Sequence, residues 1–160
     1  MTPDILLKIY SDSLGHIEKL IADVPDSRLA EMPAGLKNHA AWTLTHLCVG
    51  NDFALQCVGQ PGMCPPDWIK LAAPGSQPVP DRSAYPALTV VLETLRKQHA
   101  AVTQGVRSAP AGHFDTPSPE NVRAFAATLG HLVSYFLASH EQNHLGQLQA
   151  WKRAAGLMGD

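Results

Sequence analysis

Two histidines stand four residues apart in the segment His140-Glu141-Gln142-Asn143-His144. On a helix, side chains at this spacing lie about 40° apart around the axis and about 6 Å apart along it. Both imidazoles can therefore reach one ion, as in many zinc sites. The alternative is that both are core histidines satisfied by ordinary hydrogen bonds, or that they lie on a solvated face. Because the pair falls within an apolar stripe, we predict that His140 and His144 are metal ligands.

A third ligand has to come from elsewhere in the chain, because two histidines do not close a metal site. His46 lies in an apolar stripe of the segment 39–58 and is expected to point inward. His99 is the rival, since it falls within the apolar stripe of the segment 85–106. His39 is on the same face as His46 but nearer the helix start, where we expect it to be solvated. The residues alone rank His46 first, His99 second and His39 third.

The glutamate inside the pair raises a second possibility, a zinc peptidase in which HExxH supplies two ligands and a general base. Only sixteen residues follow His144, and the terminal Asp160 is the only His, Asp or Glu among them. The usual downstream ligand is missing, which disfavours the peptidase. Glu141 then either supports a ligand through a hydrogen bond or lies on the helix surface. Gln147, one turn after His144 on the same face, is the other candidate for supporting a ligand.

Helices are predicted to position these residues, because apolar side chains recur at steps of three and four and no long segment alternates at period two. The predicted helices span residues 3–23, 39–58, 85–106 and 118–155. Thr2 and Pro3 form a cap-then-proline start for the first helix. Ser118 and Pro119 repeat that pattern, so we place the start of the last helix there. The fold class is therefore predicted to be all-α, with residues 1–160 forming a single domain.

The connections between the helices differ in length. Residues 24–38 and 107–118 form short links, whereas residues 59–84 form a long one that contains six prolines. A loop of that length in a compact domain is uncommon and often functional. It is long enough to cross a bundle from end to end, so the second and third helices could run parallel. We expect Trp68 to hold this loop against the helices and the substrate to enter over it.

Composition and charge exclude several classes of protein. Hydrophobic residues make up 45% of the chain, and the formal net charge is −2. The absence of a basic patch argues against a nucleic-acid partner. No apolar run approaches the roughly 18 residues of a membrane span, and the first residues do not resemble a signal peptide. Three cysteines without a CxxC pair argue against a disulfide framework. We expect a cytoplasmic protein without a membrane or nucleic-acid partner.

Three passages resemble the DinB/YfiT-like superfamily of metal-binding four-helix bundles. They are Ala41–Leu47, similar to the second-helix motif that ends in a ligand histidine; Pro66-Asp67-Trp68 with the proline-rich sequence up to Tyr85-Pro86; and His140–Leu148, similar to the HxxxHxGQ ending. The resemblance covers essentially the whole chain and raises His46 above His99. It implies an up-down-down-up four-helix bundle with a long crossover loop between helices two and three. It also implies one divalent metal with open coordination positions, often in a homodimer.

The resemblance implies an activity less specifically. The superfamily includes S-transferases that use bacillithiol, mycothiol or glutathione, and isomerases, while many members carry only a generic label of metal-dependent hydrolase. Three neutral imidazoles with an open position can lower the pKa of a bound water to about 7 or hold a thiolate. We expect an enzyme that acts on a small molecule, either a hydrolase or a thiol S-transferase with a low-molecular-weight thiol as co-substrate.

Two other interpretations remain open at this point. In the first, the bundle is not catalytic and the metal stabilises it for a structural or stress-related binding role. A fourth ligand such as His99 would favour that interpretation, because closed sites are structural. In the second, the histidines only pack in the core and bind no metal. Nitrogen ligands suit zinc, nickel, iron, cobalt and manganese, and the sequence does not choose among these metals.

Overall fold

Helices are the regular elements of the computed structural model, which describes residues 3–33 and 35–158. The α-helices are α1 (Pro3–Ile21), α2 (Ala40–Cys57), α3 (Pro66–Ala72), α4 (Leu88–Ser108), α5 (Leu129–Tyr135) and α6 (Glu141–Ala154). Short 3₁₀ turns span Asp26–Arg28, Arg82–Ala84, His113–Asp115 and Glu120–Val122, and a π turn spans Phe136–His140. No strand occurs within these residues, which confirms the all-α prediction. Thr2, the expected first cap, lies outside them.

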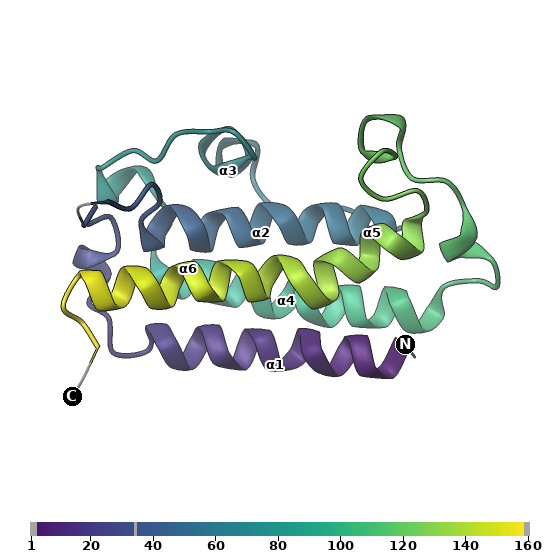
Figure 1. Cartoon of the computed structure of the whole chain (residues 1–160), viewed down its shortest axis with the longest axis horizontal. Helices are drawn as coiled ribbons and strands as arrows, with labels where there is room; N and C mark the ends of the chain where they lie inside the picture. The colour runs from purple at the N-terminus through teal and green to yellow at the C-terminus, as the bar shows by residue number, and fades with distance from the viewer. Residues whose placement is uncertain (1–2, 34, 159–160) are drawn as a thin grey trace.

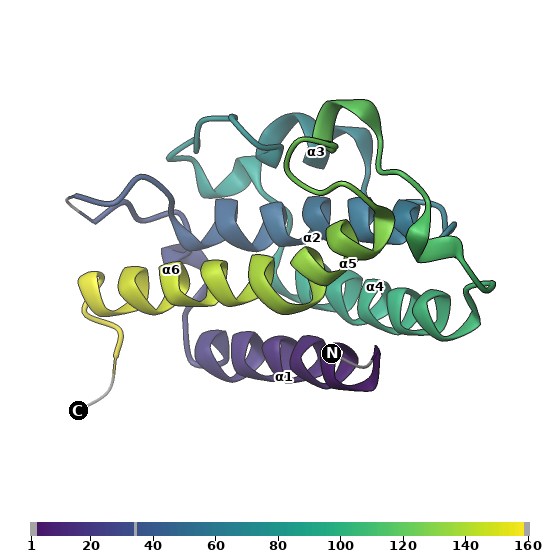
Figure 2. The ribbon, with the colours of Figure 1, turned by 45° about the vertical axis from the view of Figure 1, so that its right-hand side comes forward.

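The long helices lie side by side in Figures 1 and 2. α2 packs against α4 and α6, and α1 packs against the same two helices. α5, the π turn and α6 follow one another as one continuous helical segment, residues 129–154, which is called the last rod below. The apolar side chains between the long helices form two buried clusters, one that includes Trp151 and one that includes Phe136. None of the described helices is long and apolar enough to cross a membrane.

α2 is buried on every side, since residues 40–52 are all buried. Its outer face is covered by the segment between α2 and α4, which contains α3 and runs along α2 in Figure 1. The predicted loop 59–84 is therefore partly helical. Trp68 lies in α3 and packs against the core, in line with the expectation that it holds the loop in place. A helix that is covered all round needs apolar or hydrogen-bonded residues on every face.

Polar side chains of α2 and of its cap residue form hydrogen bonds to the segment between α2 and α4, which is called the covering segment below. The Asp52 carboxylate accepts hydrogen bonds from the backbone N–H groups of Met63 and Cys64, at 2.8 and 2.9 Å. His39 caps α2, because its Nδ1 accepts from the backbone N–H of Trp42, and its Nε2 lies 2.9 Å from the Val79 carbonyl. The prediction that His39 is solvated is wrong: its side chain is fully buried under the covering segment.

The prediction that the last helix begins near Ser118 is also wrong, because α5 begins at Leu129. The backbone N–H of Ser118 bonds to the Ala127 carbonyl, and that of Leu129 bonds to the Thr116 carbonyl. These bonds fold residues 116–129 back on themselves and leave only one 3₁₀ turn after Pro119. The true cap is Thr128, whose hydroxyl accepts from the backbone N–H of His131.

The π turn changes which face of the last rod is buried. A π turn fits one more residue into a turn than an α-helix does, so the side chains that follow it are rotated around the axis. After the turn, Glu141, Leu145 and Leu148 are buried in the core, while Gln147 is exposed. The predicted apolar stripe, which continued from His144 through Gln147 to Trp151, is therefore wrong at Gln147, whereas Trp151 is buried as that stripe requires.

Candidate metal site

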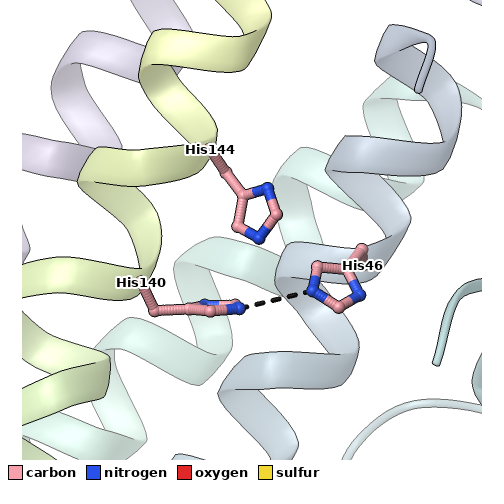
Figure 3. A group of neighbouring side chains, drawn as sticks. All are labelled: His46, His140 and His144. Carbon is pink, nitrogen blue, oxygen red and sulfur yellow. Dashed lines mark hydrogen bonds between the residues drawn. The ribbon is translucent and has the colours of Figure 1, made fainter. Parts of the chain in front are cut away.

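Three histidines from different parts of the chain point toward one another in Figure 3. His46 comes from α2, His140 ends the π turn and His144 lies in the first turn of α6. Each offers one ring nitrogen, and the three nitrogens lie within 4.8 Å of one another. The Nε2 atoms of His46 and His140 are 3.4 Å apart. No other His, Cys, Asp or Glu in residues 3–33 and 35–158 joins this group.

Hydrogen bonds on the far side of two rings define which nitrogen carries the proton. His46 Nδ1 lies 2.7 Å from the Ala72 carbonyl, and His144 Nδ1 lies 3.0 Å from the Gln147 side-chain oxygen. Both oxygens can only accept, so each Nδ1 must donate and each Nε2 keeps its lone pair. A second partner that fixes the tautomer in this way is typical of metal-binding histidines. Gln147 thus bonds to the ring nitrogen of His144 that faces away from the other two histidines in Figure 3.

The spacing of the rings suits a transition metal. With metal–nitrogen bonds of about 2.0–2.1 Å and tetrahedral angles, two ligand nitrogens lie roughly 3.3–3.4 Å apart. The Nε2 atoms of His46 and His140 are at that distance. His140 Nδ1 is buried and has no hydrogen-bond partner, so the polar contact of this ring is the one to His46. An ion between the lone pairs would give His140 a stabilising partner, and the donor set therefore fits a metal.

The environment keeps the three rings neutral. Burial is the main reason that the pKa of His140 falls to about 3, and the charges of His144 and His46 lower it further. Burial also lowers the pKa of His144 to about 4, with a further contribution from His46. The pKa of His46 is lowered by burial as well. At neutral pH all three imidazoles are unprotonated on one nitrogen and able to bind a metal.

Two residues of α2 pack directly against the imidazole rings of His46 and His140. The Trp42 indole stacks on the His46 ring, with centroids 4.7 Å apart and planes within 9°. Gly50 faces His140: a Cβ at this position would lie against the Cε1 atom of His140 and 3.0 Å from its Nδ1. A glycine is needed here because any larger residue would overlap the His140 imidazole and displace it from its present position.

A cavity of about 340 Å³ opens beside the histidines. Its other walls are Trp42, Gly50, Phe53, Pro74, Tyr135 and Phe136. An ion held by three side chains next to such a space would keep coordination positions for water or a substrate, which is the arrangement of catalytic rather than structural sites.

Glu141 lies on the other side of the last rod, in the core. Its Oε1 is 2.8 Å from His99 Nε2 and accepts a hydrogen bond from the Asn51 amide at 3.0 Å. Glu141 is 1% exposed, so the alternative that it lies on the helix surface is wrong. Neither Glu141 nor His99 lines the histidine cavity. The structure therefore does not bring the rival ligand His99 to the site, and it gives Glu141 no place as a peptidase base.

Sequence reasoning missed two members of this core network. Tyr10 stacks on His99 with ring centroids 3.6 Å apart, and its hydroxyl donates to the Asn51 side-chain oxygen. Neither residue stands in a motif, and the partners are 41 residues apart. The only signal in the sequence was the presence of polar side chains within helical segments that must be buried.

Comparison with known proteins identifies the family of this chain. The model of the DinB superfamily matches residues 10–148, a range that contains all three histidines. The chain belongs to the DinB superfamily. The resemblance inferred from the three sequence passages is thereby confirmed. No curated protein and no solved structure matches the chain.

Proposed function

We propose that this DinB-superfamily protein is a metal-dependent enzyme with one divalent ion on His46, His140 and His144. The observation that carries the proposal is the meeting of three neutral imidazoles beside an open cavity of about 340 Å³. When bound, the ion would supply Lewis-acid chemistry that acidifies a water or a thiol. The reaction class is then a hydrolysis or a thiol S-transfer on a small molecule, with a low-molecular-weight thiol as co-substrate in the second case.

The protein's own groups would prepare this chemistry. The Ala72 carbonyl and Gln147 hold the tautomers of His46 and His144. Phe53 and Phe136 line the cavity with apolar surface that limits access of water. Tyr135 has the only hydroxyl among the described lining residues, and we propose that it contacts a polar group of the substrate. Zinc, nickel, iron, cobalt and manganese all accept such nitrogen ligands.

The overall architecture belongs to the same proposal. The side-by-side packing of α1, α2, α4 and the α5–α6 rod supports an up-down-down-up bundle, with the segment between α2 and α4 as its crossover. We propose that residues 1–160 form one such domain and that it works in the cytoplasm as a homodimer. Sedimentation at low protein concentration tests the dimer, and a monomer under those conditions would contradict it.

The alternative of a non-catalytic, metal-stabilised bundle has one observation in its favour, since the histidines would tie α2 to the last rod. A closed site would need a fourth protein ligand. Within the described part of the chain no fourth candidate lies in the group, and the space beside it is open. These two observations favour the enzyme.

Metal content of the untagged protein, measured by elemental analysis, tests the proposal. We expect about one equivalent in the wild type, and none in His46→Ala or His144→Ala. His99→Gln is the matched control, because it changes a buried histidine outside the group and should keep the metal. Wild-type protein that stays metal-free after soaking with each candidate metal would overturn the proposal. Loaded protein should then be screened with esters and with pairs of thiols and electrophiles.

A further inference from the structure

We infer that the site takes a substrate with an uncharged, apolar body, which occupies a second cavity next to the histidines. This inference rests on the proposed function, because the metal end of the substrate is assigned to the three-histidine site. The second cavity has a volume of about 550 Å³. It lies among α2, α5 and the loop that precedes α5, and its walls include Gln56, Leu129 and Leu132.

The two cavities share part of their lining. Four residues line both of them: Phe53, Pro74, Tyr135 and Phe136. The two cavities are therefore neighbours, and the inferred substrate extends from the histidine cavity past these four side chains into the larger one. A reacting group at the histidines would leave the rest of the molecule in the larger space.

The walls of the larger cavity select against charge. None of its lining residues carries a charge, and Gln56 and Asn121 supply the only side-chain amides. A charged group placed there would lose part of its hydration without gaining a partner of opposite charge, which is unfavourable. The remaining walls are apolar apart from Tyr135, with Cys57 and Leu132 among them. The body of the ligand is therefore neutral and apolar.

Two aromatic side chains at this cavity are left in water. Phe53 is 46% exposed and Phe125 is 65% exposed, and both line the cavity. The Phe125 ring meets Tyr135 edge to face, with centroids 4.8 Å apart. Large apolar groups that stay exposed around a hollow are typical of ligand sites, because the ligand removes them from water.

The cavity volume sets the size of the ligand. A cavity of roughly 150 Å³ suffices for benzene, and ligand pockets run from about 300 to 1,000 Å³. At about 550 Å³, the space suits an alkyl chain of medium length or a two-ring aromatic body. One wall consists of Pro119, Asn121, Val122 and Phe125, from the loop that the sequence predicted to be helical. This loop would determine which apolar body fits.

A chain-length series tests the inference. Alkyl hydroxamic acids from two to eight carbons carry the same metal-binding head, and their Kd for zinc-loaded protein can be measured by calorimetry. Each methylene that enters an apolar cavity contributes about 0.8 kcal/mol, so Kd should fall about fourfold per methylene. Val122→Asp should abolish this dependence, and Phe125→Ala should weaken it. Val90→Asp, on an exposed α4 position away from the cavity, should leave it unchanged.

The outcomes separate the two proposals. If zinc binds but Kd does not depend on chain length, the apolar cavity is overturned and the metal site stands. If none of the candidate metals binds, the proposed function is overturned, and the cavity is tested with the neutral dye Nile red on metal-free protein. Dye binding that is lost in Val122→Asp and kept in Val90→Asp supports the cavity, and equal binding by both variants overturns it.

Discussion

Two of the three imidazoles owe their orientation to neighbours that would not touch an ion. His144 is held by a side chain one turn along α6, whereas His46 is held by a backbone carbonyl from the covering segment. Because a side-chain partner can be removed without changing the backbone, Gln147 gives the cleaner test of this effect. Partners of this kind commonly change metal affinity by a factor of 10 to 100.

Gln147→Ala should weaken zinc binding about tenfold, because the His144 ring loses the hydrogen bond that fixes its tautomer and position. Competition with a chromophoric chelator measures the Kd. Gln149→Ala is the matched control, since Gln149 is exposed on the same helix and does not line the histidine cavity. Equal affinities for both variants would show that the bond to Gln147 does not position His144.

Gly50→Ala should weaken zinc binding by at least tenfold, since the added methyl displaces the His140 ring. It should also lower the free energy of unfolding by about 1–3 kcal/mol, the usual effect of overpacking a buried site. Gly15→Ala in α1 is the control, because its methyl would meet no atom within 4 Å. That change should raise stability by up to about 1 kcal/mol through helix propensity. Zinc titration and urea unfolding measure both quantities, and unchanged zinc affinity in Gly50→Ala would contradict the packing argument.

Much of the site could be predicted from the types and the spacing of single residues. The i, i+4 spacing indicated His140 and His144, and the apolar stripe of α2 indicated His46. The position of Glu141 could not be predicted, because the π turn rotates the helix at that residue. The partners Tyr10 and Asn51 could not be predicted either, since only the packing of α1 on its neighbours brings them to Glu141 and His99.

At the scale of elements, the sequence placed α1, α2 and α4 within a few residues of their observed bounds. Their apolar periodicity is regular, and Pro25 and Gly59 follow two of them closely. The last helix was predicted to begin too early, because Ser118 followed by Pro119 has the residue types of a helix start. Backbone hydrogen bonds between residues 116–118 and residues 127–129 determine the conformation of this loop, and no local sequence pattern predicts such bonds. The same holds for His39, whose cover comes from a segment 40 residues away.

His39 should make the packing of the segment between α2 and α4 sensitive to pH. Burial is the main cause that lowers its pKa in the folded protein, and the charge of Arg82 adds to it. An unfolded histidine takes up a proton near pH 6.5, so below that pH the unfolded state binds more protons. The folded protein should therefore lose stability as pH falls from 7 to 5. Protonation would also place a donor at Nδ1, where the Trp42 N–H needs an acceptor.

His39→Asn should reduce this loss, because asparagine can cap a helix without taking up a proton. Urea unfolding at pH 7 and pH 5 measures the change in the free energy of unfolding for each variant. His16→Asn, at an exposed histidine of α1, is the control and should keep the wild-type difference between the two pH values. The same difference in His39→Asn as in the wild type would exclude His39 as a contributor to it, leaving the buried histidines of the metal site.

For the whole molecule, an ion at the three histidines would join elements that are far apart in the sequence. His46 and His140 are 94 residues apart, and the ion would link α2 to the last rod. α2 in turn holds the covering segment through His39 and Asp52. Metal binding should therefore stabilise the fold as a unit rather than one helix at a time.

Removal of the metal should lower the melting temperature of the whole protein. A ligand that binds only the folded state adds about 2.7 kcal/mol at a free concentration one hundred times its Kd. For a chain of 160 residues this corresponds to about 5–10 °C. Calorimetry with free zinc buffered at that level, compared with excess chelator, measures the shift. His46→Ala should show no zinc-dependent shift, whatever its own melting temperature. If His46→Ala gained as much as the wild type, zinc would be binding elsewhere, and the link between α2 and the last rod would not be the source of the stabilisation.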